Sequence, residues 1–186
     1  MSVPVLSFTL NSATLASLDM PVKIVDIEVE ETLNGPVAAN MVAETLAQLK
    51  SQGYEANRLK EDEVLVTADT VVVHGNKVLG KPHNEQEAYN MLRLLSGNSH
   101  YVYTGVCLKS KHGQRLFTEA TEVWFKELSD EEINYYIHTY KPFDKAGAYG
   151  IQEWIGKIGI TRIDGCYYNV MGLPLTRLYE ELKQLK

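Results

Sequence analysis

Residues 64–73 read Val64-Leu65-Val66-Thr67-Ala68-Asp69-Thr70-Val71-Val72-Val73, and this nearly continuous run of apolar and β-branched side chains decides the fold. Such a run is typical of a strand that is buried on both faces in the middle of a sheet. The next residues, His74-Gly75-Asn76-Lys77, favour a hairpin turn that leads into a second short strand at Val78-Leu79. The sequence therefore predicts a central strand with a hairpin at its end.

Shorter elements are expected on both sides of this strand. Asn84 is a suitable N-cap for a helix that Gly97 closes, and Ser129 with Glu132 forms a capping box for another helix. The other expected elements are a strand near residues 3–8, a helix over 12–18, an extended segment over 22–29, a helix opened by Pro36 that stops before Gly53, strands over 101–109 and 116–125, a Gly-rich region over 147–172 and a helix over about 175–185. This alternation predicts one α/β domain over residues 1–186, with a mixed central sheet and flanking helices.

The composition narrows the class of protein and of partner. The net charge of −6 argues against binding to a nucleic-acid backbone, which requires a basic face. An acidic chain still binds a small anion through a local group of lysines or a divalent metal. Two cysteines are too few for a disulfide framework, and no apolar run approaches the roughly 20 residues that span a bilayer. We expect a cytoplasmic protein with neither nucleic acid nor membrane as a partner.

Asp69 is the one acidic residue inside the apolar run. A carboxylate in such a place is costly unless a cation, a metal or several hydrogen-bond donors face it. From its position alone, a structural aspartate bonded to backbone amides and a functional one are equally good readings. Gly80-Lys81-Pro82, just after the hairpin, adds an ammonium on a stiff segment. A carboxylate with a lysine suits metal-assisted phosphoryl chemistry, in which the lysine neutralises phosphate.

Three other places offer charged or polar groups. Glu28, Glu30 and Glu31 form an acidic cluster of the kind that is usually only solvated, but beside Asp69 one of them would complete an all-oxygen Mg²⁺ or Mn²⁺ site. Lys50 lies at a predicted helix end, where a cation is favourable in any case.

The segment 144–152 combines small residues, which let the backbone approach a ligand, with the amide of Gln152, which suits a base edge. The alternative for this segment is a tight turn with an exposed Gln152. The histidines and cysteines show no metal-ligand spacing, and the sequence contains no glycine-rich phosphate loop.

Taken together, these segments resemble the Maf family of nucleoside triphosphate pyrophosphatases. The matching stretches, in the family's order, are Thr67-Ala68-Asp69-Thr70-Val71-Val72, Leu79-Gly80-Lys81-Pro82, Met91-Leu92-Arg93-Leu94-Leu95-Ser96-Gly97 with His100, Thr104-Gly105-Val106, Asp144-Lys145-Ala146-Gly147-Ala148-Tyr149-Gly150-Ile151-Gln152 and Tyr168-Asn169-Val170-Met171-Gly172-Leu173-Pro174-Leu175. The resemblance implies a fold similar to that of the inosine-triphosphate pyrophosphatases, with two lobes around a cleft, and a homodimer. It also implies cleavage between the α- and β-phosphates with a divalent metal, Mg²⁺ or Mn²⁺.

The resemblance assigns roles residue by residue. Asp69 would be the general base or water-orienting carboxylate, and Glu31 would join it as a second acidic, metal-binding residue. Lys50 and Lys81 would hold phosphates.

Lys145 would also bind substrate. Gln152, with Thr70, falls where the pyrimidine-preferring branch of the family reads its base, so dTTP and UTP are the expected substrates. The branch that prefers methylated guanosine triphosphate has Glu at the position of Gln152.

The N-terminus departs from the family pattern. A loop of the type Ser-x-Ser-Pro-Arg-Arg is expected near residues 7–11, but this chain reads Ser7-Phe8-Thr9-Leu10-Asn11 there and has no arginine before Arg58. Residues 1–17 are therefore atypical, and the bidentate contacts that arginine makes to phosphate are missing. Either the protein has diverged, or the N-terminal residues come from a start-site or reading-frame error.

This departure leaves rival functions open. The chief rival to the enzyme is a catalytically impaired, nucleotide-binding regulator of cell division. A weaker rival is an enzyme that removes deaminated purine nucleotides such as ITP.

Overall fold

A computed structural model of the chain describes residues 5–8, 12–33 and 35–185, with side chains from residue 14 onward. Within the described residues the strands form one sheet in the order β2-β1-β3-β5-β6-β7, with β4 paired to β3. The strands are β1 (Val5–Phe8), β2 (Val22–Ile24), β3 (Val64–His74), β4 (Lys77–Leu79), β5 (Ser99–Ser110), β6 (Gly113–Phe125) and β7 (Ile160–Asp164). The sheet is mixed, because β1 is parallel to β2 and β3 while β4 and β7 are antiparallel to their partners β3 and β6. The predicted α/β class with a mixed sheet is confirmed.

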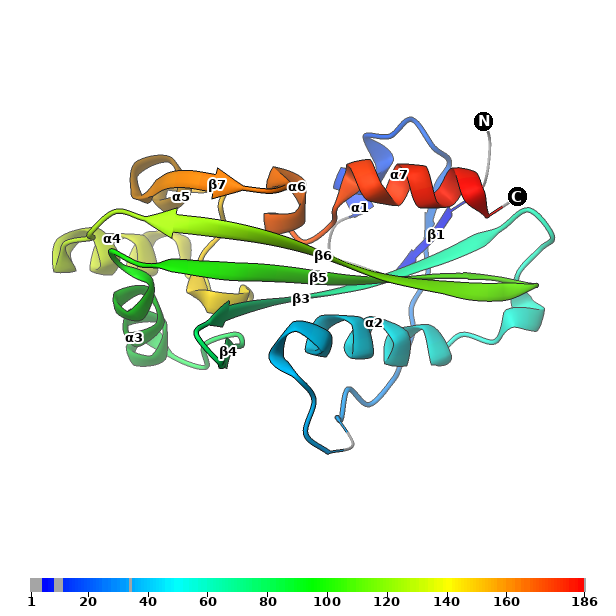
Figure 1. Cartoon of the computed structure of the whole chain (residues 1–186), viewed down its shortest axis with the longest axis horizontal. Coiled ribbons are helices and arrows are strands. Elements are labelled where there is room, and N and C mark those ends of the chain that lie inside the picture. Colours follow the sequence, from blue (N-terminus) through cyan, green and yellow to red (C-terminus); the bar gives the residue numbers. More distant parts are fainter. Residues whose placement is uncertain (1–4, 9–11, 34, 186) are drawn as a thin grey trace. The chain divides into compact units, whose positions relative to one another are not determined.

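Short and medium helices connect and flank these strands (Figure 1). The α-helices are α1 (Ser12–Ala16), α2 (Val42–Gln52), α3 (Glu85–Leu95), α4 (Asp130–Tyr140), α5 (Trp154–Gly159), α6 (Tyr167–Val170) and α7 (Leu175–Gln184), and the 3₁₀ turns are η1 (Ala39–Met41), η2 (Ala56–Arg58) and η3 (Ala146–Ala148). Among the described residues no helix is both long and apolar enough to cross a bilayer.

The chain forms two compact units that are interleaved in sequence. The first unit comprises Met1–Asp69, Thr104–Glu119 and Gly172–Lys186, and the second comprises Thr70–Tyr103 and Ala120–Met171. The division falls within β3, between Asp69 and Thr70.

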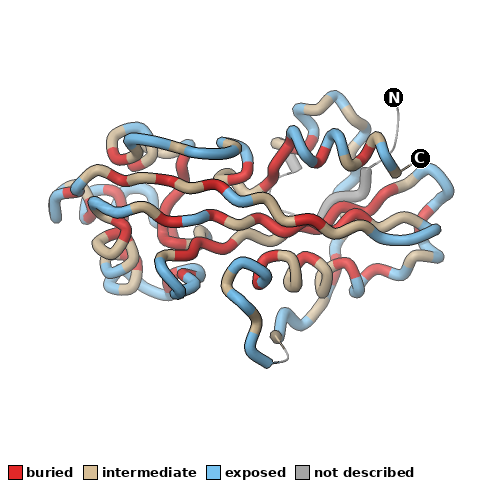
Figure 2. Tube along the Cα trace, viewed as in Figure 1, coloured by how far each residue is buried: buried red, intermediate tan, exposed pale blue. Residues whose placement is uncertain are grey.

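Helix α7 supplies much of the core of the first unit. Its buried residues Leu175, Leu178 and Leu182 recur at helical spacing and pack against Val64 and Val66 of β3. Figure 1 shows α2 and α7 on opposite sides of the strands in this unit, and Figure 2 shows the buried residues alternating with exposed ones along α7. The strands are therefore covered on both faces, as the apolar run in residues 64–73 predicts.

The core of the second unit collects the apolar faces of α3, α4 and α5. The capping signals read from the sequence are present, because Asn84 accepts a hydrogen bond from the Glu87 N–H (2.9 Å) and Ser129 forms a capping box with Glu132. The predicted hairpin also forms, with His74 paired to Lys77 and Gly75 at a φ of +59°. The starts of α3 and α4 and the hairpin after β3 were thus correctly predicted.

One prediction about local structure was wrong, and two others were less specific than the structure. The segment 22–29 is a strand only over Val22–Ile24, because its alternation breaks between Ile24 and Ile27. Pro36 opens no helix, and α2 begins only at Val42 after the turn η1. The Gly-rich region 147–172, for which no elements were predicted, contains α5, β7 and α6.

Candidate functional site

Three of the predicted site residues lie together in the first unit. The Lys50 ammonium donates a hydrogen bond to Oδ1 of Asp69 at 2.6 Å and lies 3.5 Å from Oε2 of Glu31. The side chains of Lys50 and Asp69 are only 13 % and 17 % exposed, whereas that of Glu31 is 46 % exposed. One ammonium therefore faces two carboxylates, that of Asp69 in the middle of β3 and that of Glu31 on the irregular segment after β2.

The end of α2 that carries Lys50 is fixed by three hydrogen bonds. The Thr67 hydroxyl donates to the Ala47 carbonyl at 2.6 Å from the buried strand β3. Lys109 of β5 donates to the carbonyls of Ser51 (2.9 Å) and Tyr54 (2.6 Å). These carbonyls lie at and beyond the C-terminal end of the helix, where a cation is also favourable to the helix dipole. The position of Lys50 is thus set by the sheet beneath it.

Helix α2 also approaches β5 as closely as the backbone allows. A Cβ at Gly105 would lie 2.2 Å from the backbone nitrogen of Glu44 and 2.3 Å from its Cα. No side chain fits in that space. Gly105 is therefore required for the packing of α2, and Glu44 adds a bond by accepting from the Thr118 hydroxyl at 2.7 Å.

The second unit gathers the other predicted lysines around Asp144. The Gly147 N–H donates to the Gly80 carbonyl at 3.0 Å, which joins the segment before Lys81 to the segment 144–152. Burial acts to raise the pKa of Asp144, but the hydrogen bond and charge of Lys145, with a contribution from Lys81, outweigh it and lower that pKa. Asp144 is therefore an anion with two lysines nearby.

Lys145 is held by two carboxylates. Its ammonium lies 2.9 Å from Oδ1 and 3.1 Å from Oδ2 of Asp144, and 3.3 Å from Oε1 of Glu153. Burial acts to lower the pKa of Lys145, but these two acidic neighbours outweigh burial and raise it. Lys145 accordingly keeps its charge in a half-buried place.

Gln152 and Thr70, the predicted base-reading residues, also belong to the second unit. Gln152 is exposed at a turn between Gly150 and Glu153, and Thr70 is half-buried in β3. The exposed Gln152 agrees with either alternative drawn from the sequence, so its role stays a prediction. Asp69, Lys50 and Glu31 belong to one unit, while Thr70, Lys81, Lys145 and Gln152 belong to the other.

The chain matches the family described as Maf-like protein over residues 12–185. This chain belongs to the Maf-like family. The match begins beyond the atypical stretch 7–11, of which residues 9–11 lie outside the described part of the structure.

Close sequence relatives of this Maf-like chain are named as enzymes. A protein of Phocaeicola vulgatus named dTTP/UTP pyrophosphatase is 54 % identical over 157 residues, which cover 84 % of this chain and 81 % of the relative. A protein of the same name from Flavobacterium johnsoniae is 48 % identical over 168 residues, which cover 90 % of this chain and 85 % of the relative.

The Maf-like chain also resembles the solved structure of the Staphylococcus aureus Ham1 protein, with a TM-score of 0.56 and 16 % identity. That likeness covers 98 % of this chain and 100 % of the other. At this identity it shows the fold alone.

Sequence reasoning missed two polar residues of the Maf-like site region, Tyr136 and Glu153. Tyr136 lies on α4 and is fully buried, and its hydroxyl donates to Glu153. A buried tyrosine needs a hydrogen-bond partner, but its spacing on the apolar face of a helix gives no hint of which partner it finds. Glu153 was visible only as the residue after Gln152, with no spacing that relates it to Lys145.

His100, which was noted only as part of a motif, is buried in the second unit of the Maf-like chain. Its Nε2 lies 2.7 Å from the Tyr149 hydroxyl, and its ring stacks against Phe125. Burial, with a smaller contribution from the charge of His74, lowers the pKa of His100 to about 3. The imidazole is therefore neutral and anchors Tyr149 within the segment 144–152.

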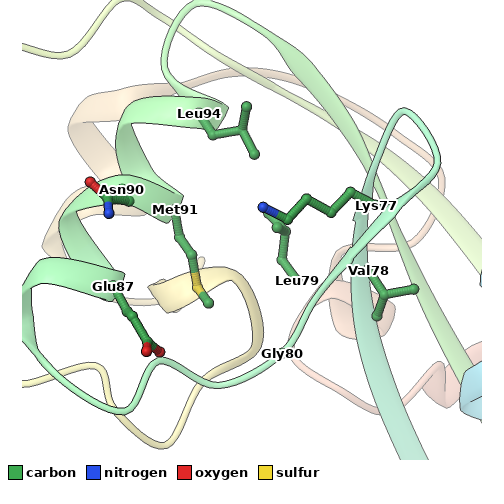
Figure 3. A pocket seen from close by; sticks show the side chains of 8 residues that line it. All are labelled: Lys77, Val78, Leu79, Gly80, Glu87, Asn90, Met91 and Leu94. Atoms are coloured by element: carbon green, nitrogen blue, oxygen red, sulfur yellow. The ribbon is translucent and has the colours of Figure 1, made fainter.

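A pocket of about 280 Å³ lies between β4 and α3 (Figure 3). Figure 3 shows the Lys77 side chain extending across it toward α3. The lining residues are Lys77, Val78, Leu79, Gly80, Glu87, Asn90, Met91 and Leu94. None of the predicted site residues lines this pocket, so the lysine–carboxylate clusters are a separate feature of the Maf-like chain.

Proposed function

We propose that this chain is a nucleoside triphosphate pyrophosphatase that hydrolyses dTTP and UTP to the monophosphate and pyrophosphate. The observation that carries the proposal is the half-buried pair of Lys50 and Asp69, in a chain about half identical to proteins named for this activity. The carboxylate suits a water nucleophile, and the ammonium suits a phosphate. The regulator has no comparable support, since these relatives carry the name of an enzyme.

Asp69 orients the attacking water and accepts its proton in this proposal. Before substrate binds, the Lys50 ammonium neutralises the carboxylate at 2.6 Å. A triphosphate competes for that ammonium because it carries more negative charge than one carboxylate. As Lys50 turns to the phosphate, the Asp69 carboxylate becomes available to the water, which ties the activation of the base to the presence of substrate.

Glu31 and Asp69 are suitable ligands for Mg²⁺ or Mn²⁺. Both carboxylates lie within 3.5 Å of the same ammonium, so their oxygens converge on one cation position. No group of three or more acidic, histidine or cysteine ligands occurs among the described residues, but Mg²⁺ commonly takes only one or two carboxylates and completes its shell with water and substrate phosphates. A bound divalent ion would neutralise charge that develops on the phosphates.

Lys81 and Lys145 are proposed to bind phosphates from the second unit. Asp144 holds the Lys145 ammonium at 2.9 Å, and the charge of Lys81 contributes to lowering the pKa of the same carboxylate. Gln152, exposed on its turn, and Thr70 are proposed to read the pyrimidine edge through hydrogen bonds. We also propose a homodimer with no nucleic acid as partner.

The test is pyrophosphate release from dTTP and UTP by the purified chain with Mg²⁺ or Mn²⁺. We expect turnover that is lost with a chelator and falls at least a hundredfold in Asp69→Asn. ITP serves as the comparison substrate, and a preference for ITP would contradict the pyrimidine assignment. Binding of dTTP with no turnover above the Asp69→Asn variant would instead support the regulator.

A further inference from the structure

The hydroxyl of Tyr136 connects two parts of the segment 144–153. It accepts a hydrogen bond from the Gly150 N–H at 3.1 Å and donates one to Oε2 of Glu153. Tyr136 has no exposed surface, so its phenol is fixed by the core of the second unit. One rigid side chain therefore makes two directed contacts at the same loop.

These two contacts lie at the two ends of one turn. The Glu153 N–H donates to the Gly150 carbonyl at 3.0 Å and closes a four-residue turn. Of its two central residues, Ile151 is buried and Gln152 is exposed. The phenol thus holds the first residue through its amide and the last through its side chain, and Gln152 projects from between them.

The same turn is connected to Lys145. While Oε2 of Glu153 accepts from the phenol, Oε1 lies 3.3 Å from the Lys145 ammonium. Gly150 makes room for this arrangement, since a Cβ there would lie 2.9 Å from Cε of Lys145 and 3.0 Å from Cδ of Glu153. A displacement of Glu153 would therefore move both the turn and the lysine.

We propose that Tyr136 is a positioning residue that, through Glu153, holds the turn carrying Gln152 and the ammonium of Lys145 in one fixed arrangement, and so couples base recognition to phosphate binding. The inference rests on the proposed function, because it assigns Gln152 to the base and Lys145 to a phosphate. Burial, together with the hydrogen bond to Glu153, raises the pKa of Tyr136, so the phenol stays a proton donor at any physiological pH.

The main test compares Tyr136→Phe with Tyr140→Phe. Tyr140 lies one turn later on α4, its ring stacks on that of Tyr136, and it is 38 % exposed, which makes it a matched control. We expect Tyr136→Phe to lower kcat/KM for dTTP about tenfold and to lower the preference for dTTP over dCTP, because an unpaired partner is left at each end of the turn. Tyr140→Phe should leave both within about twofold.

Substitutions at Glu153 separate its hydrogen bond with the Tyr136 phenol from its ion pair with Lys145. Glu153→Gln keeps an acceptor for the phenol but removes the charge that faces Lys145, so we expect a raised KM with an unchanged preference for dTTP over dCTP. Glu153→Ala removes both and should lower the preference as well. A general loss of folding would lower the apparent kcat in these variants but leave KM and the preference unchanged, and this outcome would overturn the proposal.

A measurement without turnover distinguishes this inference from the proposed function. Hydrogen exchange at the Gly150 amide should become at least tenfold faster in Tyr136→Phe and stay unchanged in Tyr140→Phe. If the wild-type chain fails to hydrolyse dTTP, the proposed function fails, while the exchange rate and the dTTP dissociation constants of the same variants still test the phenol. Unchanged exchange together with an unchanged preference for dTTP in Tyr136→Phe would overturn the positioning role.

Discussion

The Lys50 ammonium lies 2.6 Å from Oδ1 of Asp69, and both side chains are more than four-fifths covered. Ion pairs on a protein surface contribute little, but a half-buried carboxylate depends much more on its cation. The pair is therefore both a structural contact and, in the proposed function, the point where phosphate competes with a carboxylate. These two roles are separable by substitution.

Removing either partner alone should destabilise the protein. We expect Lys50→Met to lower the free energy of unfolding by about 1–3 kcal/mol, because it leaves the charged Asp69 without the ammonium that faces it. The double variant Lys50→Met with Asp69→Asn should regain most of that loss but show no turnover. Urea unfolding with a pyrophosphate assay measures both. Lys60→Met removes an exposed ammonium 3.5 Å from Glu63 and should change stability by less than about 0.5 kcal/mol.

Gly105→Ala should displace α2. The added Cβ would lie 2.2 Å from the Glu44 nitrogen, so the helix must move away from β5 and carry Lys50 with it. We expect a loss of about 3 kcal/mol in the free energy of unfolding, the upper end for overpacking, and a raised KM for dTTP. Gly113→Ala is the matched control, since nothing lies within 4 Å of a Cβ at Gly113. Equal stability of the two variants would contradict the close approach.

His100 should make the protein sensitive to mild acid. Its pKa is about 3 in the folded chain, against about 6.5 when unfolded, so between these values the unfolded state binds one more proton. Above pH 6.5 the protonation of His100 therefore takes nothing from the free energy of unfolding. As the pH falls from 6.5 toward 3, it lowers that free energy by about 1.4 kcal/mol per pH unit.

Other groups also titrate in that range, so the relevant quantity is a difference between variants. In His100→Phe the loss of stability from pH 6 to pH 4 should be shallower than in the wild type by about 1.4 kcal/mol per pH unit. A parallel pair of stability curves for wild type and His100→Phe would show that His100 is protonated in the folded protein.

Gln152→Glu should alter base preference without altering the fold. Gln152 is exposed, so its substitution should change the free energy of unfolding by less than about 0.5 kcal/mol. A carboxylate accepts hydrogen bonds but donates none, so the preference among dTTP, dCTP and dGTP should change in competition assays. Gln114→Glu adds the same charge at another exposed position and should leave the preference unchanged. An unaltered preference in Gln152→Glu would mean that Gln152 does not contact the base.

The elements that sequence predicted best are those with a local physical signal. The apolar run 64–73 specified β3 to within one residue, and the side chains of Asn84 and Ser129 specified the starts of α3 and α4. In each case the deciding interaction is within a few residues of the chain. No helix begins at Pro36, because proline is compatible with the first turn of a helix but does not by itself induce a helix.

The pairings within the candidate site had no such local signal. Glu31, Lys50 and Asp69 were each identified by residue type and by resemblance. Only the packing of the folded chain brings the two carboxylates to the Lys50 ammonium. Tyr136 and Glu153 went unnoticed because a phenol on an apolar helix face looks like core. Their connection requires knowing that α4 passes beside the turn at Gly150.

The boundary between Asp69 and Thr70 has a consequence for how this protein evolves. The first unit includes both chain ends, and each unit is assembled from separated segments. Consequently no single recombination breakpoint separates one unit from the other, and any breakpoint within residues 70–171 divides both. Chimeras made by exchanging segments between relatives would therefore inherit mismatched cores, so this lineage is expected to diversify by point substitution within an unbroken chain.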